Sequence, residues 1–139
     1  MEKRRNSILI PYYFRDGNLH VFLQRRSHEA PRNPNILGGF GGGLEGDENN
    51  EKTLLRELRE ELEYTPKKYS LLGVFETDHS ISNYYIEKVS EDFENNIKIH
   101  EGTGGEWHRA QDVIERDDIS PNTRRVITTM ILDTNGKVK

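Results

Sequence analysis

The chain of 139 residues contains no cysteine and carries a formal charge of −4, with a pI near 5.8. Its length suits one domain over residues 1–139, which buries roughly two-thirds of the surface of the unfolded chain. The acidic balance argues against binding of a nucleic acid polymer, which needs a basic face. The absence of cysteine excludes disulfides and thiolate chemistry, and we expect a cytoplasmic location.

The N-terminal segments predict a β-hairpin. Residues 7–14 are rich in β-branched and aromatic side chains, and apolar residues alternate over 19–24, so both segments are predicted strands. Asp16 and Gly17 lie between them, and Asp-Gly tolerates the positive φ of a tight turn. The first apolar segment is short and contains Pro11, which indicates a strand and not a signal peptide. No apolar run approaches the length of a membrane span, so we expect no membrane association.

A polar segment with two prolines follows the hairpin and predicts a long loop, which returns as a short strand over residues 36–40. Arg25 and Arg26 end the second strand, and a guanidinium is suited to forked contacts with substrate phosphates. An ordinary pair of surface arginines explains them equally well. The glycines at positions 38, 39, 41, 42 and 43 allow the backbone to approach a ligand or a metal closely.

The segment after the glycines predicts an amphipathic helix. It is expected to begin near residues 49–51, with Asp47 or Asn49 as the cap, and to end before Pro66. At about 100° per residue, one arc of this helix is apolar and the neighbouring arc is acidic. The apolar arc consists of Leu54, Leu55, Leu58 and Leu62, and the acidic arc of Glu57, Glu60 and Glu61.

The acidic arc needs a positive partner. Glu57 faces Glu60 at i+3 and Glu61 at i+4, where like charges cost each other a few tenths of a kcal/mol. A divalent cation would offset this repulsion, and hard oxygen ligands are what Mg²⁺ prefers. The alternative is a solvated surface on which Arg56 and Arg59 pair with nearby acids.

Downstream of this helix the sequence predicts further strands and two helices. The expected elements are strands over 69–76 and 81–89 with a turn at 78–80, a brief strand over 97–99, and a short helix over 112–116. Ser120 and Pro121 form an N-cap and a first helical residue, so they predict the start of a terminal helix. The apolar face of that helix consists of Val126, Ile127, Met130 and Ile131.

The spacing of the glycines and acids resembles a known signature. Gly42 is followed after five residues by Glu48, and after seven more by the run over 56–61, which reads R-E-L-R-E-E. This resembles the Nudix box of the Nudix hydrolases, G-x5-E-x7-R-E-U-x-E-E-x-G-U, in which U is aliphatic. Glu63 and Tyr64 depart from the box, where it has a glycine and an aliphatic residue, so they bear on the end of the helix more than on the chemistry.

The resemblance implies a fold and a reaction. The fold is α/β, a Nudix-type α/β/α sandwich with a mixed β-sheet between helices, and it covers nearly the whole chain. The reaction is the attack of water on a diphosphate linkage in a nucleoside diphosphate joined to another group, with Mg²⁺ as the cofactor and Mn²⁺ as an alternative. The expected partner is therefore a small nucleotide, and the sequence leaves the oligomeric state open.

The resemblance also implies roles for the residues of the box. Metal ligands are expected at Glu57, Glu60, Glu61 and the main-chain carbonyl of Gly41. Glu57 is either a ligand or the base that activates water. Arg56 is expected to orient that carboxylate, and Glu48 to be a supporting acid near the start of the helix.

Within the superfamily the chain is most similar to the MutT-type nucleoside triphosphate pyrophosphohydrolases. Residues 101–107 match their distal segment E-G-x-x-G-E-W, which makes Glu101 a further metal ligand or base, with Glu106 as the second choice. Arg25 and Arg26 match an arginine that contacts phosphate, and Asn122 lies near an asparagine that reads the purine.

This similarity implies hydrolysis of a (modified) purine nucleoside triphosphate to the monophosphate and pyrophosphate. One alternative is an ADP-sugar or dinucleoside polyphosphate hydrolase, which would use the same acidic residues. The other alternative is a catalytically silent Nudix-fold module that binds a nucleotide or a protein, and it is motivated by the two departures from the box.

Overall fold

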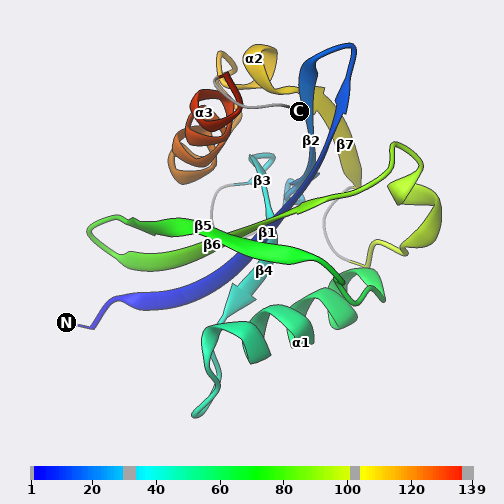
Figure 1. The fold of residues 1–139 in the computed structure, drawn as a ribbon. Coiled ribbons are helices and arrows are strands. Elements are labelled where there is room, and N and C mark those ends of the chain that lie inside the picture. The colour runs from blue at the N-terminus through cyan, green and yellow to red at the C-terminus, as the bar shows by residue number, and fades with distance from the viewer. Residues whose placement is uncertain (1, 30–33, 101–103, 136–139) are drawn as a thin grey trace.

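The structure is a computed structural model in which residues 2–29, 34–100 and 104–135 are described. A seven-stranded mixed sheet forms its centre (Figure 1). The strands are β1 (Arg4–Arg15), β2 (Asn18–Arg25), β3 (Leu37–Gly38), β4 (Phe40–Gly43), β5 (Tyr69–Glu76), β6 (Ser80–Lys88) and β7 (Gly105–Arg109). The helices are α1 (Asn50–Leu62), the 3-10 helix η1 (Phe93–Asn96), α2 (Ala110–Val113) and α3 (Pro121–Asn135).

The sheet is mixed because one central pairing is parallel. Its strand order is β3-β2-β1-β6-β5, with β4 paired to β1 and β7 paired to β2. Strands β1 and β6 run parallel, and every other pairing of the named strands is antiparallel. The hairpin between β1 and β2 turns at Asp16 (φ 52°) and Gly17 (φ 79°), which confirms the predicted turn.

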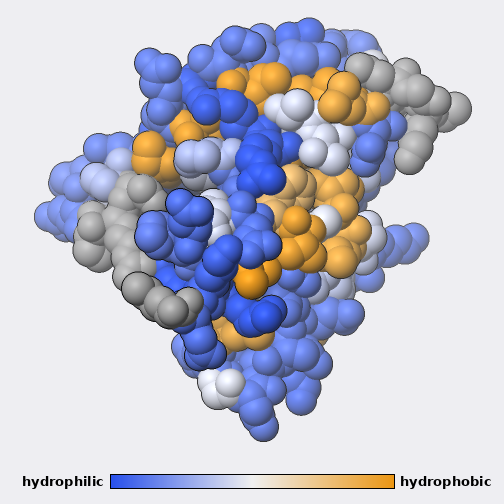
Figure 2. All heavy atoms as spheres, turned by 90° about the vertical axis from the view of Figure 1, so that its left-hand side faces the viewer, coloured by the Kyte–Doolittle hydropathy of each residue, from blue (hydrophilic) through white to orange (hydrophobic). Residues whose placement is uncertain are grey.

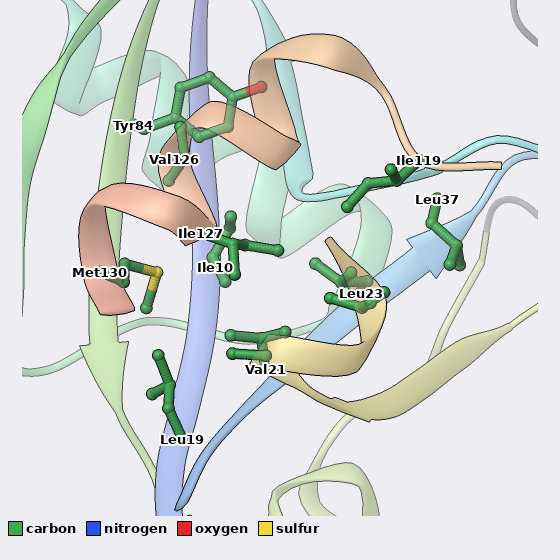
Figure 3. Close-up of a cluster of buried hydrophobic side chains, with 12 residues drawn as sticks. Ile10, Leu19, Val21, Leu23, Leu37, Tyr84, Ile119, Val126, Ile127 and Met130 are labelled. Atoms are coloured by element: carbon green, nitrogen blue, oxygen red, sulfur yellow. The ribbon is translucent and has the colours of Figure 1, made fainter. Parts of the chain in front are cut away.

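Helices cover both faces of this sheet, so the predicted α/β/α sandwich is confirmed (Figure 1). Neighbouring residues of a strand point to opposite faces. Leu9 therefore packs with the leucines of α1, while Ile10 packs with α2 and α3. Figure 3 shows the second of these cores, in which Ile10 of the sheet lies beside Ile127 of α3, and Val21 lies below them.

Helix α1 begins and ends as local chemistry requires. The side chain of Asn49 accepts a hydrogen bond from the backbone N–H of Lys52 at 2.9 Å, so Asn49 is the cap. Leu54, Leu58 and Leu62 are fully buried, and Leu55 is only partly so. The helix stops at Glu63, whose φ of 52° is left-handed. The apolar arc is thus confirmed for three of its four leucines.

The structure differs from the predicted elements at the glycine run. Gly41 to Gly43 form part of strand β4, where Gly41 pairs with Ile8 and Gly42 with Ser7. The predicted strand over residues 36–40 is divided between β3 and β4, with Gly39 between them. The pairing of β4 with β1 joins residues more than 30 positions apart, and no local pattern encodes it.

Two further predictions about elements were inaccurate. Residues 97–99 form no strand, because Lys98 and His100 donate their backbone N–H groups to Leu62 and Glu61 at the end of α1. The short helix expected at 112–116 lies two residues earlier, at α2. The terminal helix begins as predicted, with Ser120 Oγ accepting from the backbone N–H of Thr123 at 3.2 Å. No helix among the described residues is long and apolar enough to cross a membrane.

Candidate active site

Arg56 is the centre of the polar cluster at the start of α1. Its Nε donates to Glu48 Oε2 at 2.7 Å, and its Nη1 donates to Glu57 Oε2 at 2.6 Å. The same Nη1 lies 3.4 Å from Glu60 Oε1, while Nη2 donates to the carbonyl oxygen of Gly43 at 3.1 Å. One guanidinium therefore joins the helix, the loop before it and strand β4. The structure thus brings Arg56, Glu48, Glu57 and Glu60 together as the sequence predicts.

Glu48 is held in its charged form by this cluster. Hydrogen bonds from Arg56 lower the pKa of Glu48 to about 2, and the backbone N–H of Glu45 and the hydroxyl of Thr53 contribute. Glu48 in turn raises the pKa of Arg56. Because Arg56 is fixed on one side by Glu48, its other side is directed at Glu57.

Glycines of β4 allow the carboxylate of Glu57 to lie against the sheet. A Cβ on Gly42 would lie 2.5 Å from Glu57 Oε1, closer than real side chains approach. Gly41 has a φ of +147°, and a Cβ there would lie 2.0 Å from the carbonyl oxygen of Ser7. Position 41 therefore requires glycine, whereas a side chain at position 42 would force the carboxylate of Glu57 to move. The spacing of the box thus has a local reason: the acid occupies the space that a side chain at position 42 would need.

The remaining acids of the predicted metal site differ in exposure. The side chain of Glu60 is 58% exposed, whereas Glu61 is 3% exposed and belongs to the buried side of α1. The three acids of the predicted arc therefore do not share one environment in this conformation, since the side chain of Glu57 is 15% exposed. Glu101 lies outside the described residues.

The donor set nevertheless fits a hard cation. Among the described residues, no group of three or more His, Asp or Glu side chains converges as a metal site. Glu57 and Glu60 do converge on one positively charged group, because Nη1 of Arg56 lies within 3.4 Å of both. Carboxylate oxygens are the ligands that Mg²⁺ prefers. The same two oxygens that contact Arg56 are therefore suited to a divalent ion.

A cavity of about 770 Å³ borders this cluster at Gly41 and Gly42. Two arginines, Arg4 and Arg26, are its only charged lining residues among those described, so the cavity is positive although the chain is acidic. Figure 2 shows that the adjoining face of the molecule is mostly hydrophilic, with hydrophobic side chains gathered in patches. The cavity is suited to an anionic ligand that reaches from the arginines to the acids of α1.

The two arginines predicted to bind phosphate take different positions. Arg26 lines the cavity, whereas Arg25 does not. Arg25 Nε donates to Glu106 Oε2 at 2.8 Å, and its Nη1 donates to Asp118 Oδ2 at 3.0 Å. Period-2 alternation at the end of β2 directs the two side chains apart. Glu106, the second choice for a distal ligand, is likewise committed to Arg25 and to His108.

Two buried amides line the same cavity. Asn122 at the start of α3 is 9% exposed, and its Oδ1 accepts from Arg125 Nη1 at 3.0 Å. Gln24 on β2 is also 9% exposed, and its Oε1 is buried without a hydrogen-bond partner in the described part of the chain. The sequence pattern indicated Asn122 but not Gln24. The sequence did contain a signal for Gln24. It is a polar residue after an apolar run, and it lies two positions before Arg26, so strand alternation places both on the same face.

Comparisons with known proteins agree with this architecture. The sequence matches the NUDIX domain family over residues 3–130. An 8-oxo-dGTP diphosphatase of Escherichia coli (strain K12) is 31% identical over 119 residues, which cover 84% of this chain and 89% of that protein.

Solved structures of this fold are also similar. The NUDIX domain of Shewanella oneidensis NrtR, complexed with ADP ribose, superposes with a TM-score of 0.73 at 19% identity, covering 96% of this chain and 89% of that one. An Ap4A hydrolase of C. elegans superposes with a TM-score of 0.72 at 17% identity, covering 96% and 98%. The chain therefore belongs to the NUDIX family, as a MutT-like Nudix hydrolase.

Proposed function

We propose that this protein hydrolyses a diphosphate linkage in a nucleoside diphosphate derivative, with a purine nucleoside triphosphate as the leading substrate class. The products would be the nucleoside monophosphate and pyrophosphate. One observation carries this proposal: the acids gathered around Arg56 adjoin a positive cavity at Gly41 and Gly42. Similarity to an 8-oxo-dGTP diphosphatase supports the choice of a purine triphosphate.

Mg²⁺ is the proposed cofactor. Glu57, Glu60, Glu61 and the carbonyl oxygen of Gly41 would hold it, with Glu101 as a further ligand from outside the described residues. When bound, the ion neutralises charge on the phosphates and lowers the pKa of a water molecule. The hard oxygen donors support Mg²⁺, and they accept Mn²⁺ as well.

The chain's own residues would bind and orient the substrate. Arg26 and Arg4 line the cavity and would contact phosphate oxygens through forked hydrogen bonds. Arg56 would keep Glu57 directed at Gly42 and the cavity edge, where Glu57 can accept a proton from water. A carboxylate of ordinary basicity is a weak base, so much of the activation must come from the metal.

A substrate panel tests the proposal. 8-oxo-dGTP, dGTP, ADP-ribose and Ap4A would each be incubated with Mg²⁺, then with Mn²⁺, and the products separated by ion-exchange chromatography. We expect the triphosphates to give a monophosphate and pyrophosphate. Failure to cleave any of the four with either metal would overturn the proposal and favour a binding module.

The second candidate is hydrolysis of ADP-ribose or a dinucleoside polyphosphate. Similarity to an ADP-ribose-bound NUDIX domain and to an Ap4A hydrolase supports it, and a cavity of about 770 Å³ is of the size that holds one small molecule. The substrate panel separates the two candidates, and Asn122→Ala tests the reason for preferring the first. If the purine triphosphate is the substrate, the variant loses activity; unchanged turnover of dGTP would remove the reason to place its base against Asn122.

A further inference from the structure

The side-chain amide of Gln24 is unusual because it is buried in the wall of the cavity and its oxygen has no hydrogen-bond partner among the described residues. The residue is 9% exposed, and its Oε1 is fully buried with no hydrogen-bond partner in the described part of the chain. Most buried polar atoms in folded proteins have a partner, because burial without one costs free energy. Gln24 itself lines the cavity, and rotation of its terminal amide about χ3 would exchange the buried Oε1 with the NH₂ group, so that a ligand in the cavity can supply the missing donor.

Strand pairing explains why no neighbouring side chain satisfies Gln24. On one side its cross-strand partner is Gly38 of β3, and on the other side it is Gly105 of β7. Neither glycine brings a side-chain donor to the amide. The space beside Gln24 is therefore left to the cavity, which Gly38 also lines.

The other amide of the cavity is already oriented. Asn122 Oδ1 accepts from Arg125 Nη1, and the same Nη1 donates to the carbonyl oxygen of Glu76 at 3.2 Å. With its oxygen engaged, Asn122 offers its NH₂ group as a donor. The cavity thus offers a donor from α3 and, once the amide of Gln24 has turned, an acceptor from β2, while its charged residues among those described are both arginines.

We infer that Gln24 is a specificity-determining residue whose amide oxygen accepts an N–H group of the substrate's base. This inference rests on the proposed function, because it places the base of the nucleotide in the same cavity as Arg26. The recognised class is a purine that carries an N–H on its polar edge, such as guanine. A purine without any N–H group would leave the oxygen of Gln24 without a hydrogen-bond donor, as in the free protein.

The test pairs two substrates with two proteins. dGTP carries N–H groups on its base, and the triphosphate of purine 2′-deoxyriboside carries none. We expect the wild-type protein to favour dGTP by roughly 10- to 100-fold in kcat/KM, as one hydrogen bond to a buried acceptor implies. Gln24→Met keeps the length of the side chain without the amide, and it should bring this ratio close to one. An equal loss for both substrates would overturn the inference.

The Tm of the free protein distinguishes a ligand-binding role of Gln24 from a structural role, because the two roles predict opposite changes. If Gln24 is kept for the ligand, Gln24→Met removes an unsatisfied buried oxygen and raises the Tm of the free protein by a few degrees. A fall in Tm would show that the amide serves the fold, and it would contradict the inference. Ser27→Ala, at a partly buried residue just before the turn that follows β2, is the control for handling and expression.

Binding measurements separate failure of the inference from failure of the proposed function. If neither triphosphate is hydrolysed, the proposed function fails, and the inference is tested with dGMP and purine 2′-deoxyriboside monophosphate by calorimetry. The wild-type protein should then bind dGMP more tightly by roughly 10-fold or more, and Gln24→Met should not. Equal affinities in the wild-type protein would overturn the inference.

Discussion

Arg56 and Arg25 have similar exposure and similar ion pairs, but they lie in different parts of the molecule. Their side chains are 19% and 21% exposed, and each contacts at least two carboxylates. The carboxylates of Arg56 lie along α1 and the loop before it, and one of them contacts β4 at the edge of the cavity. Those of Arg25, Glu106 and Asp118, join β2 to β7 and to the segment before α3. The same ion-pair chemistry thus occurs at the candidate site and in the framework that supports it.

Position therefore decides the role of such a cluster. Ion pairs of this kind contribute little when exposed, and removal of one partner is costly when the other stays buried. The cluster around Arg56 borders a cavity, so a ligand can replace one of its contacts. Arg25 does not line the cavity, and its contacts with Glu106 and Asp118 join segments of the chain to one another. We expect variants of the first to change catalysis and variants of the second to change stability.

The largest expected effect is on turnover. Glu60→Gln should lower kcat by roughly a thousandfold or more without unfolding the protein, since it removes a proposed metal ligand whose side chain is 58% exposed. Steady-state kinetics with Mg²⁺ and circular dichroism together measure both properties. Glu45→Gln is a matched control, because Glu45 also lies near Arg56, at 3.7 Å, and is not a proposed ligand. Equal loss in both variants would contradict the assignment.

The second expected effect is on folding. Arg25→Leu should lower the free energy of unfolding by about 1–3 kcal/mol, because Glu106 and Asp118 each lose a charged hydrogen bond while staying partly buried. Urea denaturation measures this change. We expect the KM for the nucleotide to rise for Arg26→Leu, which lines the cavity, and to change little for Arg25→Leu. The reverse result would return Arg25 to the substrate site.

Local sequence signals predict much of the fold and part of the difference between the surroundings of Arg56 and Arg25. Asp16-Gly17, the Asn49 cap and the apolar face of α3 are such signals, and each is present as predicted. The resemblance to the box likewise implies that Arg56 orients Glu57, and the hydrogen bond between them agrees; the pairing of Arg56 with Glu48 comes from the structure. Strand β4 and the cavity depend on contacts between distant segments, so no local pattern could predict them.

Two features of the site follow from strand alternation, which places neighbouring side chains on opposite sides of a sheet. Continued to the end of β2, this alternation separates Arg25 from Arg26, and it pairs Gln24 with Arg26. The burial of Glu61 does not follow from any such rule. An ideal helix places Glu61 at the border between the apolar and acidic arcs, and tertiary packing determines whether a residue at that border is buried.

A smaller effect is expected on the stability of the protein at low pH. Hydrogen bonds from Arg116, and then from Arg25, hold the pKa of Asp118 well below its ordinary value of 3.8. A carboxyl whose pKa is lower in the folded state stabilises the fold above its unfolded pKa, and that stability is lost as the pH falls below it. The free energy of unfolding should therefore decline below about pH 4.

Asp118→Asn isolates this contribution. The variant should be less stable than the wild-type protein at about pH 6, and the difference should shrink steadily as the pH falls below about 4. Thermal unfolding across this range gives the comparison. A constant difference between the two proteins at every pH would show that Asp118 acts through packing and not through its charge.

The smallest effect concerns the end of α1, where the chain departs from the box. Glu63 adopts a left-handed φ of 52°, which favours glycine. Glu63→Gly should stabilise the protein by about 0.5–1 kcal/mol, since the strain it relieves exceeds the entropy that glycine adds to the unfolded chain. Glu63→Ala keeps the strain and loses the contact of Glu63 with His100, so it should stabilise nothing. Equal stability of these two variants would show that φ is not the cause.

The claim that the acids of α1 bind a divalent cation is tested most directly by titration of the protein with Mn²⁺, followed by the electron paramagnetic resonance signal of the free ion. We predict that the wild-type protein binds Mn²⁺, that Glu57→Gln and Glu60→Gln weaken binding by roughly tenfold or more, and that Glu45→Gln leaves it unchanged. The same Mn²⁺ affinity in all four proteins would contradict the account.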